Sequence, residues 1–361
     1  MVISIMMRTV FSSPGQKFFN NLIRSSKSMD QDKPLRIALI GLGRAGRFHL
    51  QSIRTLPQIE LAHVVDVDPE QAARIGSDFN CANSTNMDAA LEDDSVKAVI
   101  VATPTGEHHQ QIIASLNAGK AVFTEKPLGN GLNEIRECFR ASQKAGKGLF
   151  VGFNRRFDPS FADLASQVQG GAIGSPQLIR LTSRDSPLPS MDYIRTSHGI
   201  FHDCIVHDFD MLRFITHEDP IEVYAIGSNF VDDIRDLKDL DNVLVSLKYE
   251  SGLLASIDVN RFASYGYDQR IEAFGGQGMI QAENRSPRST VLSNHSGINR
   301  PLIEHSFPTR YREAYVEELN VFHHCVSTGK PLPIGESDVI MSHILCDKAE
   351  QSFKEGRPIK L

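Results

Sequence analysis

The chain has 361 residues, of which 41% are hydrophobic and 23% charged, and its formal net charge is −6. This composition is ordinary for a soluble globular protein of about two domains, and it excludes fully disordered, collagen-like and coiled-coil proteins. A net negative charge does not attract nucleic acid or an anionic membrane, and no apolar run approaches the roughly 20 residues that span a bilayer. We therefore expect neither nucleic acid nor a membrane as a partner.

The five cysteines are far apart and form no CxxC pair. An odd number of scattered cysteines argues against a disulfide framework and against a cysteine-based zinc site. The sequence therefore favours a reducing compartment.

Residues 1–29 contain four basic residues, several serines and no acidic residue. Such a composition is typical of an organelle transit peptide, although a disordered leader before a second start at Met29 would look the same. We therefore expect residues 1–33 to be a leader, either disordered or a transit peptide. The predicted location is cytoplasmic, or mitochondrial if residues 1–29 act as a transit peptide.

Short apolar runs alternate with helical stretches in the first half of the chain. Buried strands are expected at 35–40, 59–67, 97–102, 121–124 and 148–153, with helices after residue 46 and at 108–117 and 133–145. Strands that alternate with helices predict a parallel sheet covered on both faces. Residues 34–152 are therefore expected to form an α/β domain with a doubly wound parallel sheet of the Rossmann type.

The pattern changes after residue 153. Asp158-Pro159 has the composition of a helix start and predicts a helix to about residue 169. Longer strands are expected at 177–183, 221–229, 242–249, 252–260, 269–275 and 278–282, interrupted by a helix around 202–216. Tyr315, Leu319, Phe322 and Val326 would form one apolar helix face. Residues 153–361 are thus expected to form an α+β domain with an open, mostly antiparallel sheet, which binds substrate and mediates oligomerisation.

A glycine-rich turn follows the first predicted strand. Gly41, Gly43 and Gly46 form G-x-G-x-x-G, in which the first glycine permits the tight turn and the second admits a pyrophosphate. The third lets the helix pack on the strand, and the helix N-terminus then offers N–H groups to the phosphate. Asp66 lies 20 residues after Gly46, where a carboxylate accepts hydrogen bonds from ribose hydroxyls. Together these features predict a dinucleotide site.

The charge at the ribose position bears on the choice of cofactor. A 2′-phosphate would meet Asp66 and also Asp68, unless Asp68 simply points to solvent. Repulsion between like charges therefore favours NAD over NADP.

Two further loops follow predicted strands, at the sheet edge where ligands bind. Thr103-Pro104 follows the run at 97–102, and Glu125-Lys126-Pro127 follows the run at 121–124. Lys126 there could stabilise negative charge on a substrate oxygen, or it could be an ordinary solvated lysine.

A dense polar cluster lies around residues 198–210. If 202–216 is helical, Asp203 and His207 share one face, so the acid could hold the tautomer of a histidine acting as general base. A metal site made by His202, Asp203 and His207 is a rival interpretation, as is a satisfied core histidine. Because no recognised ligand spacing appears, we expect no metal. Oxidation should then rise with pH around the histidine reference pKa of about 6.5.

Together these motifs resemble the glucose–fructose oxidoreductase / inositol dehydrogenase (Gfo/Idh/MocA) family. The matching pieces are the 41–46 turn, Thr103-Pro104-Thr105 with His108, Glu125-Lys126-Pro127 and Asp203-x3-His207-Asp208, in the family's order. The segments at 152–158 and 264–270 look specifically like the inositol 2-dehydrogenase branch.

The resemblance implies a set of site residues and an oligomer. Lys126, Asp203 and His207 would be catalytic, with Lys126 contacting the reacting hydroxyl and His207 taking its proton. The open sheets of two-domain protomers would pair to form dimers or tetramers. The implied substrate contacts are Lys126, Arg155, Asp203 and His207. The implied cofactor contacts are Gly41, Leu42, Gly43, Arg44, Ala45, Gly46, Asp66, Thr103, Pro104, His108, Glu125, Lys126 and Asn154.

The resulting hypothesis is an NAD-dependent oxidoreductase that oxidises a secondary alcohol of a cyclic polyol or sugar, as myo-inositol 2-dehydrogenases do. The polyol or sugar is the expected small-molecule partner. Two alternatives remain open at this point. One is an NAD-dependent glycosidase on the same fold, and the other is a non-catalytic dinucleotide-binding regulatory protein.

Overall fold

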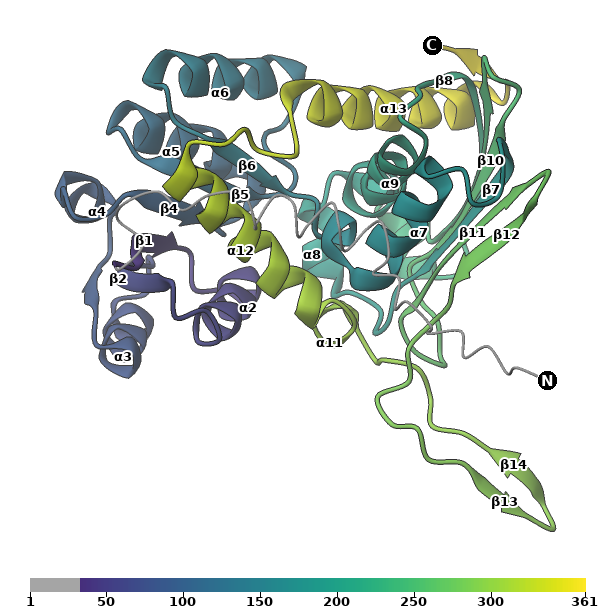
Figure 1. Cartoon of the computed structure of the whole chain (residues 1–361), viewed down its shortest axis with the longest axis horizontal. Coiled ribbons are helices and arrows are strands. Elements are labelled where there is room, and N and C mark those ends of the chain that lie inside the picture. Colours follow the sequence, from purple (N-terminus) through teal and green to yellow (C-terminus); the bar gives the residue numbers. More distant parts are fainter. Residues whose placement is uncertain (1–32) are drawn as a thin grey trace, which may run out of the picture.

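The computed structural model describes residues 33–361, so the expected leader lies outside the described residues except for its last position. Two sheets with their helices stand next to each other (Figure 1). Within residues 33–361, none of the helices combines the length and apolar composition needed to cross a bilayer.

The first sheet is parallel throughout and has the strand order β3-β2-β1-β4-β5-β6. Its strands β1, β4, β5 and β6 are almost entirely buried, because helices cover both faces. The doubly wound parallel sheet expected from the sequence is therefore confirmed. The bounds are β1 (Leu35–Ile40), β2 (Ile59–Val65), β3 (Ala82–Ser84), β4 (Ala98–Val101), β5 (Ala121–Glu125) and β6 (Leu149–Gly152).

Helices α5 and α6 lie above this sheet in Figure 1, and α2 and α3 lie below it. The unit α3-β3-α4 was missed by sequence reasoning, although Asp68-Pro69 carries its start signal. The Asp68 carboxylate accepts the N–H groups of Glu70 and Gln71 and so caps α3. The bounds are α2 (Arg44–Ile53), α3 (Pro69–Phe79), α4 (Asp88–Glu92), α5 (Thr105–Asn117) and α6 (Leu132–Ala145).

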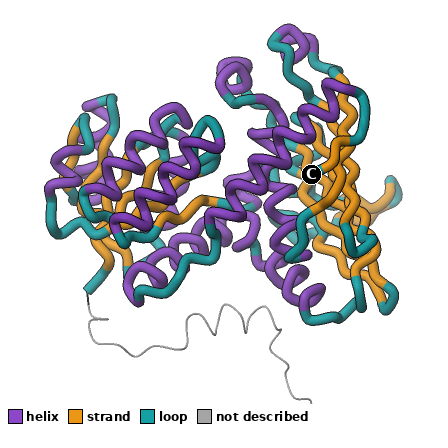
Figure 2. Tube along the Cα trace, turned by 90° about the horizontal axis from the view of Figure 1, so that it is seen from above, coloured by secondary structure: helices purple, strands orange, loops and turns teal. Residues whose placement is uncertain are grey.

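The second sheet has the order β12-β11-β7-β10-β9-β8-β15, and only the β7–β10 pair is parallel. The mostly antiparallel sheet is therefore confirmed. Helices lie along one of its faces and leave the other uncovered (Figure 2), so burial alternates along β9. The bounds are β7 (Pro176–Arg184), β8 (Pro220–Ser228), β9 (Asn242–Tyr249), β10 (Leu254–Asn260), β11 (Asp268–Gly275), β12 (Gly278–Ala282) and β15 (Ile359–Lys360).

The hairpin of β13 (Leu292–Asn294) and β14 (Gly297–Asn299) projects from this part of the chain (Figure 1). The remaining helices lie between the two sheets or on their faces. Their bounds are η1 (Asn154–Phe157), α7 (Pro159–Gln169), α8 (Met191–Thr196), η2 (Phe201–Ile205), α9 (Val206–Thr216), α10 (Asp232–Asp236), α11 (Phe307–Arg310), α12 (Arg312–Thr328) and α13 (Glu336–Glu355).

The helix expected at 202–216 is not a regular α-helix. Residues 201–205 form the π-helical turn η2, and α9 continues from it. A π-turn makes i→i+5 hydrogen bonds and widens the helix, and such turns are frequent at functional sites. The simple i,i+4 relation assumed for Asp203 and His207 is therefore lost.

Helix α12 brings the end of the chain back to the first sheet. The ring of Phe322 lies 5.8 Å from that of Phe123 and 5.9 Å from that of Phe150, and these two rings stack at 5.0 Å. Leu319 and Tyr315 on the same helix are also buried, which confirms the apolar face predicted for this segment. Aromatic packing thus fixes the C-terminal part of the chain against the sheet of the N-terminal part.

Two helix caps differ in burial and so provide a matched pair for measurement. Asp158 caps α7 and also pairs with Arg310, and both side chains are 1% exposed. Asp158→Ala should cost about 3–5 kcal/mol of unfolding free energy, because Arg310 is left buried and unpaired. Asp68→Ala, which removes an exposed cap, should cost about 1 kcal/mol. Equal losses in urea denaturation would contradict this reading of Asp158.

Candidate active site

The three motif glycines have different surroundings in the structure. Gly41 has φ +90°, and a Cβ there would lie 2.7 Å from the carbonyl oxygen of Ala102. A Cβ on Gly46 would collide with the carbonyl oxygen of Gly41. A Cβ on Gly43 would meet nothing within 4 Å, so the space beside this residue is open to a ligand.

The open space lies at the carboxyl ends of the neighbouring strands β1 and β4, between which the strand order reverses. This is the point where doubly wound sheets bind ligands. Helix α2 begins there at Gly43, and no side chain among the described residues caps it. Its first N–H groups are therefore available to a pyrophosphate. These residues fit a dinucleotide.

The Asp66 carboxylate lies next to the glycine turn. Its Oδ2 accepts the N–H of Leu42 at 2.7 Å, and its Oδ1 accepts the N–H of Asp68 at 3.0 Å. These bonds fix the carboxylate at the end of β2, where the adenosine ribose of a dinucleotide would lie. Because the Asp68 side chain is used to cap α3, the electrostatic case against a 2′-phosphate depends on Asp66 alone.

His108 connects the loops that follow β4 and β5. Its buried ring lies 2.8 Å, through Nε2, from the carbonyl oxygen of Thr103 and 2.8 Å, through Nδ1, from that of Pro127. Neither nitrogen is therefore available to a dinucleotide. His108 thus holds the two loops together in the structure, and its contact with the cofactor stays a prediction.

Glu125 faces a buried polar group at the end of β5. Its Oε1 lies 2.7 Å from Nε2 of His49, and the carboxylate of Glu318 on α12 lies near both. Burial and the charge of Glu125 raise the pKa of Glu318 well above its ordinary value. Sequence reasoning missed Glu318, whose one signal is that an acidic residue falls within the apolar face of α12.

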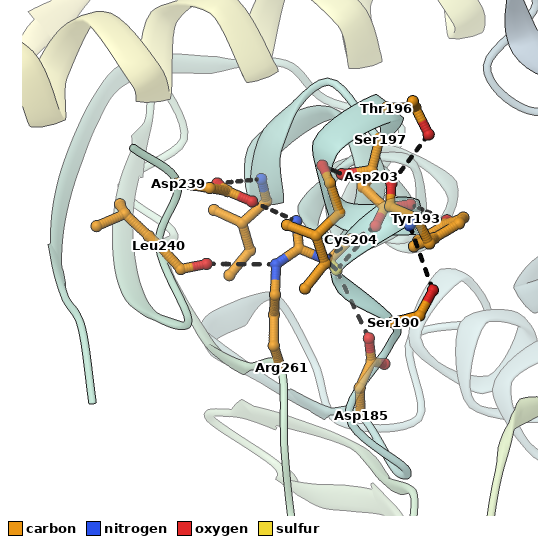
Figure 3. Close-up of polar contacts among 12 residues, drawn as sticks. Asp185, Ser190, Tyr193, Thr196, Ser197, Asp203, Cys204, Asp239, Leu240 and Arg261 are labelled. Atoms are coloured by element: carbon orange, nitrogen blue, oxygen red, sulfur yellow. Dashed lines mark hydrogen bonds and ion pairs between the residues drawn. The ribbon is translucent and has the colours of Figure 1, made fainter. Parts of the chain in front are cut away.

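Lys126 and Asp203 meet across the gap between the two sheets. Lys126 Nζ donates to the backbone oxygen of Asp203 at 2.6 Å and lies 3.3 Å from its Oδ1. The hydroxyl of Tyr193 and the guanidinium of Arg261 also donate to this carboxylate, at 2.6 and 3.0 Å. Figure 3 shows Arg261 between Asp203 and Asp239. The structure therefore brings Lys126 and Asp203, two of the three residues expected to be catalytic, into contact, with partners that the sequence did not reveal.

These partners determine the charge of Asp203. Burial by itself would raise the pKa of Asp203, but Lys126, Arg261 and Tyr193 outweigh it and bring the pKa below its usual range. Asp203 is therefore ionised at neutral pH and holds the Lys126 ammonium in place.

His207 is not oriented by Asp203, which corrects the expected catalytic pair. Its Nδ1 is buried and has no hydrogen-bond partner among residues 33–361, and the carboxylate of Asp203 is occupied by Lys126, Tyr193 and Arg261. The physical reason is the π-turn η2, which changes the register between the two residues. The ring packs edge-on to Phe153 at 6.1 Å instead.

The expected titration of His207 near 6.5 is also wrong. Burial, followed by the charges of Lys126 and Arg155, lowers the pKa of His207 well below its ordinary value. The imidazole is therefore neutral at pH 7 and able to accept a proton. Since Nδ1 is buried and the ring is only partly so, Nε2 is the nitrogen that can meet a substrate hydroxyl.

Arg155 and Asn154 are buried in η1, next to this group. Arg155 donates to Oδ1 of Asp208 at 2.7 Å and to Oγ of Ser183 at 3.0 Å. Its charge is therefore compensated, and it forms part of the wall behind His207. The neighbouring Arg156 pairs with Asp210 in the same way.

Asp185, directly after β7, is a titratable group that sequence reasoning missed. Burial and the charge of Asp203 raise its pKa to about 6, although Arg261, Arg155 and Lys126 oppose them. The Sγ of Cys204 lies 3.7 Å from its Oδ2. Because Cys204 directly follows Asp203 in the chain, this contact places Asp185 next to the same group. Its only sequence signal is a position at a strand end.

Comparisons with known proteins agree with this site. Residues 35–153 match the model of the oxidoreductase family with an NAD-binding Rossmann fold, and residues 161–281 match the GFO/IDH/MocA C-terminal domain. The chain therefore belongs to the Gfo/Idh/MocA family of oxidoreductases. It is an NAD-dependent dehydrogenase, as the fold and the glycine turn indicate.

Particular relatives cover nearly the whole chain. A myo-inositol 2-dehydrogenase of Thermotoga maritima is 39% identical over 91% of this chain and 98% of its own length. An inositol 2-dehydrogenase of Rhizobium meliloti is 37% identical over 91% and 99%. The crystal structure of a scyllo-inositol dehydrogenase from Lactobacillus casei with bound NAD(H) and scyllo-inositol superimposes with a TM-score of 0.85 at 27% identity, over 91% and 99%. None of these is described as a glycosidase or a regulator.

The two glycines Gly43 and Gly46 give a test of the dinucleotide cradle. Gly43→Ala should leave thermal stability almost unchanged and weaken NAD binding, because its Cβ would enter only the open space. Gly46→Ala should destabilise the fold itself, because its Cβ would collide with backbone. Calorimetric titration with NAD and thermal unfolding measure both effects. Unchanged NAD affinity in Gly43→Ala would contradict the placement of the pyrophosphate.

Proposed function

We propose that this protein oxidises a ring hydroxyl of an inositol or of a closely similar cyclic polyol. The observation that carries the proposal is the contact of Lys126 with Asp203 directly after β5. His207 fits this site as a base, because burial and the charges of Lys126 and Arg155 lower its pKa. The names of the relatives support the substrate class. Lys126, Asp203 and His207 remain the proposed catalytic residues.

In the proposed mechanism, the substrate hydroxyl lies between Lys126 and His207. NAD, which the 41–46 turn and Asp66 would hold, would supply the hydride acceptor for the carbon that carries this hydroxyl. His207 takes the hydroxyl proton on Nε2, and the Lys126 ammonium stabilises the charge that develops on the oxygen. Asp203 holds the Lys126 side chain in position through its backbone oxygen and its carboxylate. Asp185 accepts a hydrogen bond from a further substrate hydroxyl when it is ionised.

The substrate class is tested by an absorbance screen for NADH formation with myo-inositol, scyllo-inositol, other inositols, hexoses and acyclic diols. The proposal expects turnover with one or more inositols and little with acyclic diols. Cleavage of a glycoside without net NADH would instead support the glycosidase. The absence of any turnover, with NAD still bound, would support the regulatory protein.

The pH dependence separates the roles of Asp185 and His207. Oxidation should rise with pH through an apparent pKa of about 6, where Asp185 ionises, and Asp185→Asn should remove this step. His207→Gln should lower turnover about 10²–10⁴-fold and leave the step in place, because His207 titrates well below that pH. NAD affinity should be unchanged in both variants. A step near pH 6 that persists in Asp185→Asn would overturn the assignment.

Linkage to stability gives an independent control for the same group. The folded pKa of Asp185 lies above the unfolded value, so ionisation costs stability as pH rises from about 4 to about 6. Asp185→Asn should therefore raise the melting temperature at pH 7 and leave it nearly unchanged at pH 4. A variant that is equally stabilised at both pH values would show that the effect is not electrostatic.

We further propose a homo-oligomer, a dimer or tetramer, in which the uncovered sheet faces pair. This face carries one exposed apolar side chain from each of five strands, and such patches mark interaction surfaces. Light scattering should give the mass of a dimer or tetramer. Substitution of two of these exposed apolar side chains by glutamate should lower the measured mass. A monomeric native protein would refute the proposal. The residues are Ile226, Leu244, Leu254, Phe274 and Met279.

Two organisational predictions stay as proposals. Residues 34–152 bind the dinucleotide, and residues 153–361 supply most of the substrate contacts and the oligomer interface. A cytoplasmic location is proposed, with mitochondria as the alternative if residues 1–29 are a transit peptide; those residues lie outside the described part of the chain. Fluorescent fusions with and without residues 1–29 distinguish the two locations.

A further inference from the structure

A second cluster of chemistry-bearing side chains lies where α13 packs on η2. His343 and Asp347 are one turn apart on α13, and His202 approaches them from η2. The Nε2 of His202 lies 3.1 Å from Oδ1 of Asp347, and the Nε2 of His343 lies 3.8 Å from its Oδ2. The two imidazole rings are 4.7 Å apart between centroids. Three ligand atoms from two helices therefore converge on one point.

This cluster is separate from the catalytic group. His202 directly precedes Asp203 in the chain, but its ring is directed to α13, whereas Asp203 contacts Lys126, Tyr193 and Arg261. The rival metal set considered from the sequence, with His202, Asp203 and His207 together, is thus not assembled. The proposed hydride-transfer mechanism makes no use of His343 or Asp347.

We propose that His202, His343 and Asp347 form a binding site for a divalent transition metal ion of the Zn²⁺ type. Zinc is bound by imidazole nitrogen and carboxylate oxygen at about 2.0–2.2 Å, so ligand atoms around it stand about 3.3 Å apart. One ligand atom from each of the three residues lies within 4.8 Å of the other two, and each imidazole lies 3.1 or 3.8 Å from one of the two oxygens of Asp347. Small side-chain rotations therefore suffice to complete the site.

The protonation states also suit a metal, because an imidazole must be neutral to act as a ligand. Burial lowers the pKa of His202 below its ordinary value, although Asp347 opposes this. Burial and the neighbouring His202 lower the pKa of His343 in the same way. Two partly exposed histidines and a half-exposed aspartate leave the site accessible to an ion from solvent.

A metal bound here would join α13 to the π-helical turn that carries Asp203. The site would therefore act on stability and on the position of η2, not on hydride transfer. The ion would cross-link two segments about 140 residues apart in the chain. A metal that closes a long loop removes more chain entropy from the unfolded state, and so stabilises the fold more, than one that closes a short loop.

The test uses the untagged full-length protein, stripped with a chelator and titrated with Zn²⁺ against a chromophoric competitor. We expect one Zn²⁺ per chain and a rise in melting temperature on binding. His343→Ala and Asp347→Asn should each weaken binding by at least about 10–100-fold, the loss known for disturbed metal sites, and abolish the thermal shift. His295→Ala, which removes an exposed histidine from the β13–β14 turn, is the matched control and should bind normally. Circular dichroism verifies that each variant is folded.

Co²⁺ gives a second readout that does not depend on stability, because its visible absorption reports four-coordinate nitrogen and oxygen ligation. The bands should appear in the native protein and in His295→Ala, and be lost in His343→Ala. The proposal is overturned if the native protein retains no Zn²⁺ at micromolar concentrations. It is also overturned if binding survives in both α13 variants, or disappears in Glu318→Gln instead, since that result would place the ion at His49, Glu125 and Glu318.

Discussion

The carboxylate of Asp203 is the point on which the rest of the site depends. It is almost completely buried, and three donors from different parts of the chain converge on it: Lys126, Tyr193 and Arg261. A buried charge persists only when it is paired and hydrogen-bonded. Arg261, itself fully buried, is in turn shared with Asp239. One carboxylate thus fixes a lysine of the first sheet against a helix and a loop of the second.

This arrangement also determines the base. Asp203 holds the Lys126 side chain within the site. Burial lowers the pKa of His207 most, and the charges of Lys126 and Arg155 lower it further. A histidine with a lowered pKa is a weaker base, but it is fully neutral at physiological pH and ready to take a proton. The weaker driving force for proton transfer to His207 is offset by Lys126, which stabilises the negative charge left on the substrate oxygen. The Lys126–Asp203 pair therefore affects both the base strength of His207 and the stabilisation of charge on the substrate oxygen.

Local signals in the sequence were sufficient for the nucleotide end of the site. The glycines, Asp66 and Lys126 act through backbone conformation and strand ends, which short segments encode. The partners of Asp203 are different, because Tyr193, Asp239 and Arg261 are brought together only by tertiary folding. The π-turn at 201–205 has no recognisable local pattern, so the regular helix expected there misplaced Asp203 relative to His207. Asp185 could not be found because its raised pKa exists only in the folded environment.

The polar run from 202 to 210 shows why a cluster in sequence is not a cluster in space. Side chains on a helix point in directions about 100° apart from one residue to the next, and the π-turn changes that rotation. His202 therefore turns to α13, whereas Asp203, the next residue, contacts Lys126. The two following acids pair behind the site with buried arginines of η1. Residues 202–210 therefore contribute to three places: the contact with α13, the candidate active site and the ion pairs behind it. The partners of these charged side chains come from different parts of the chain.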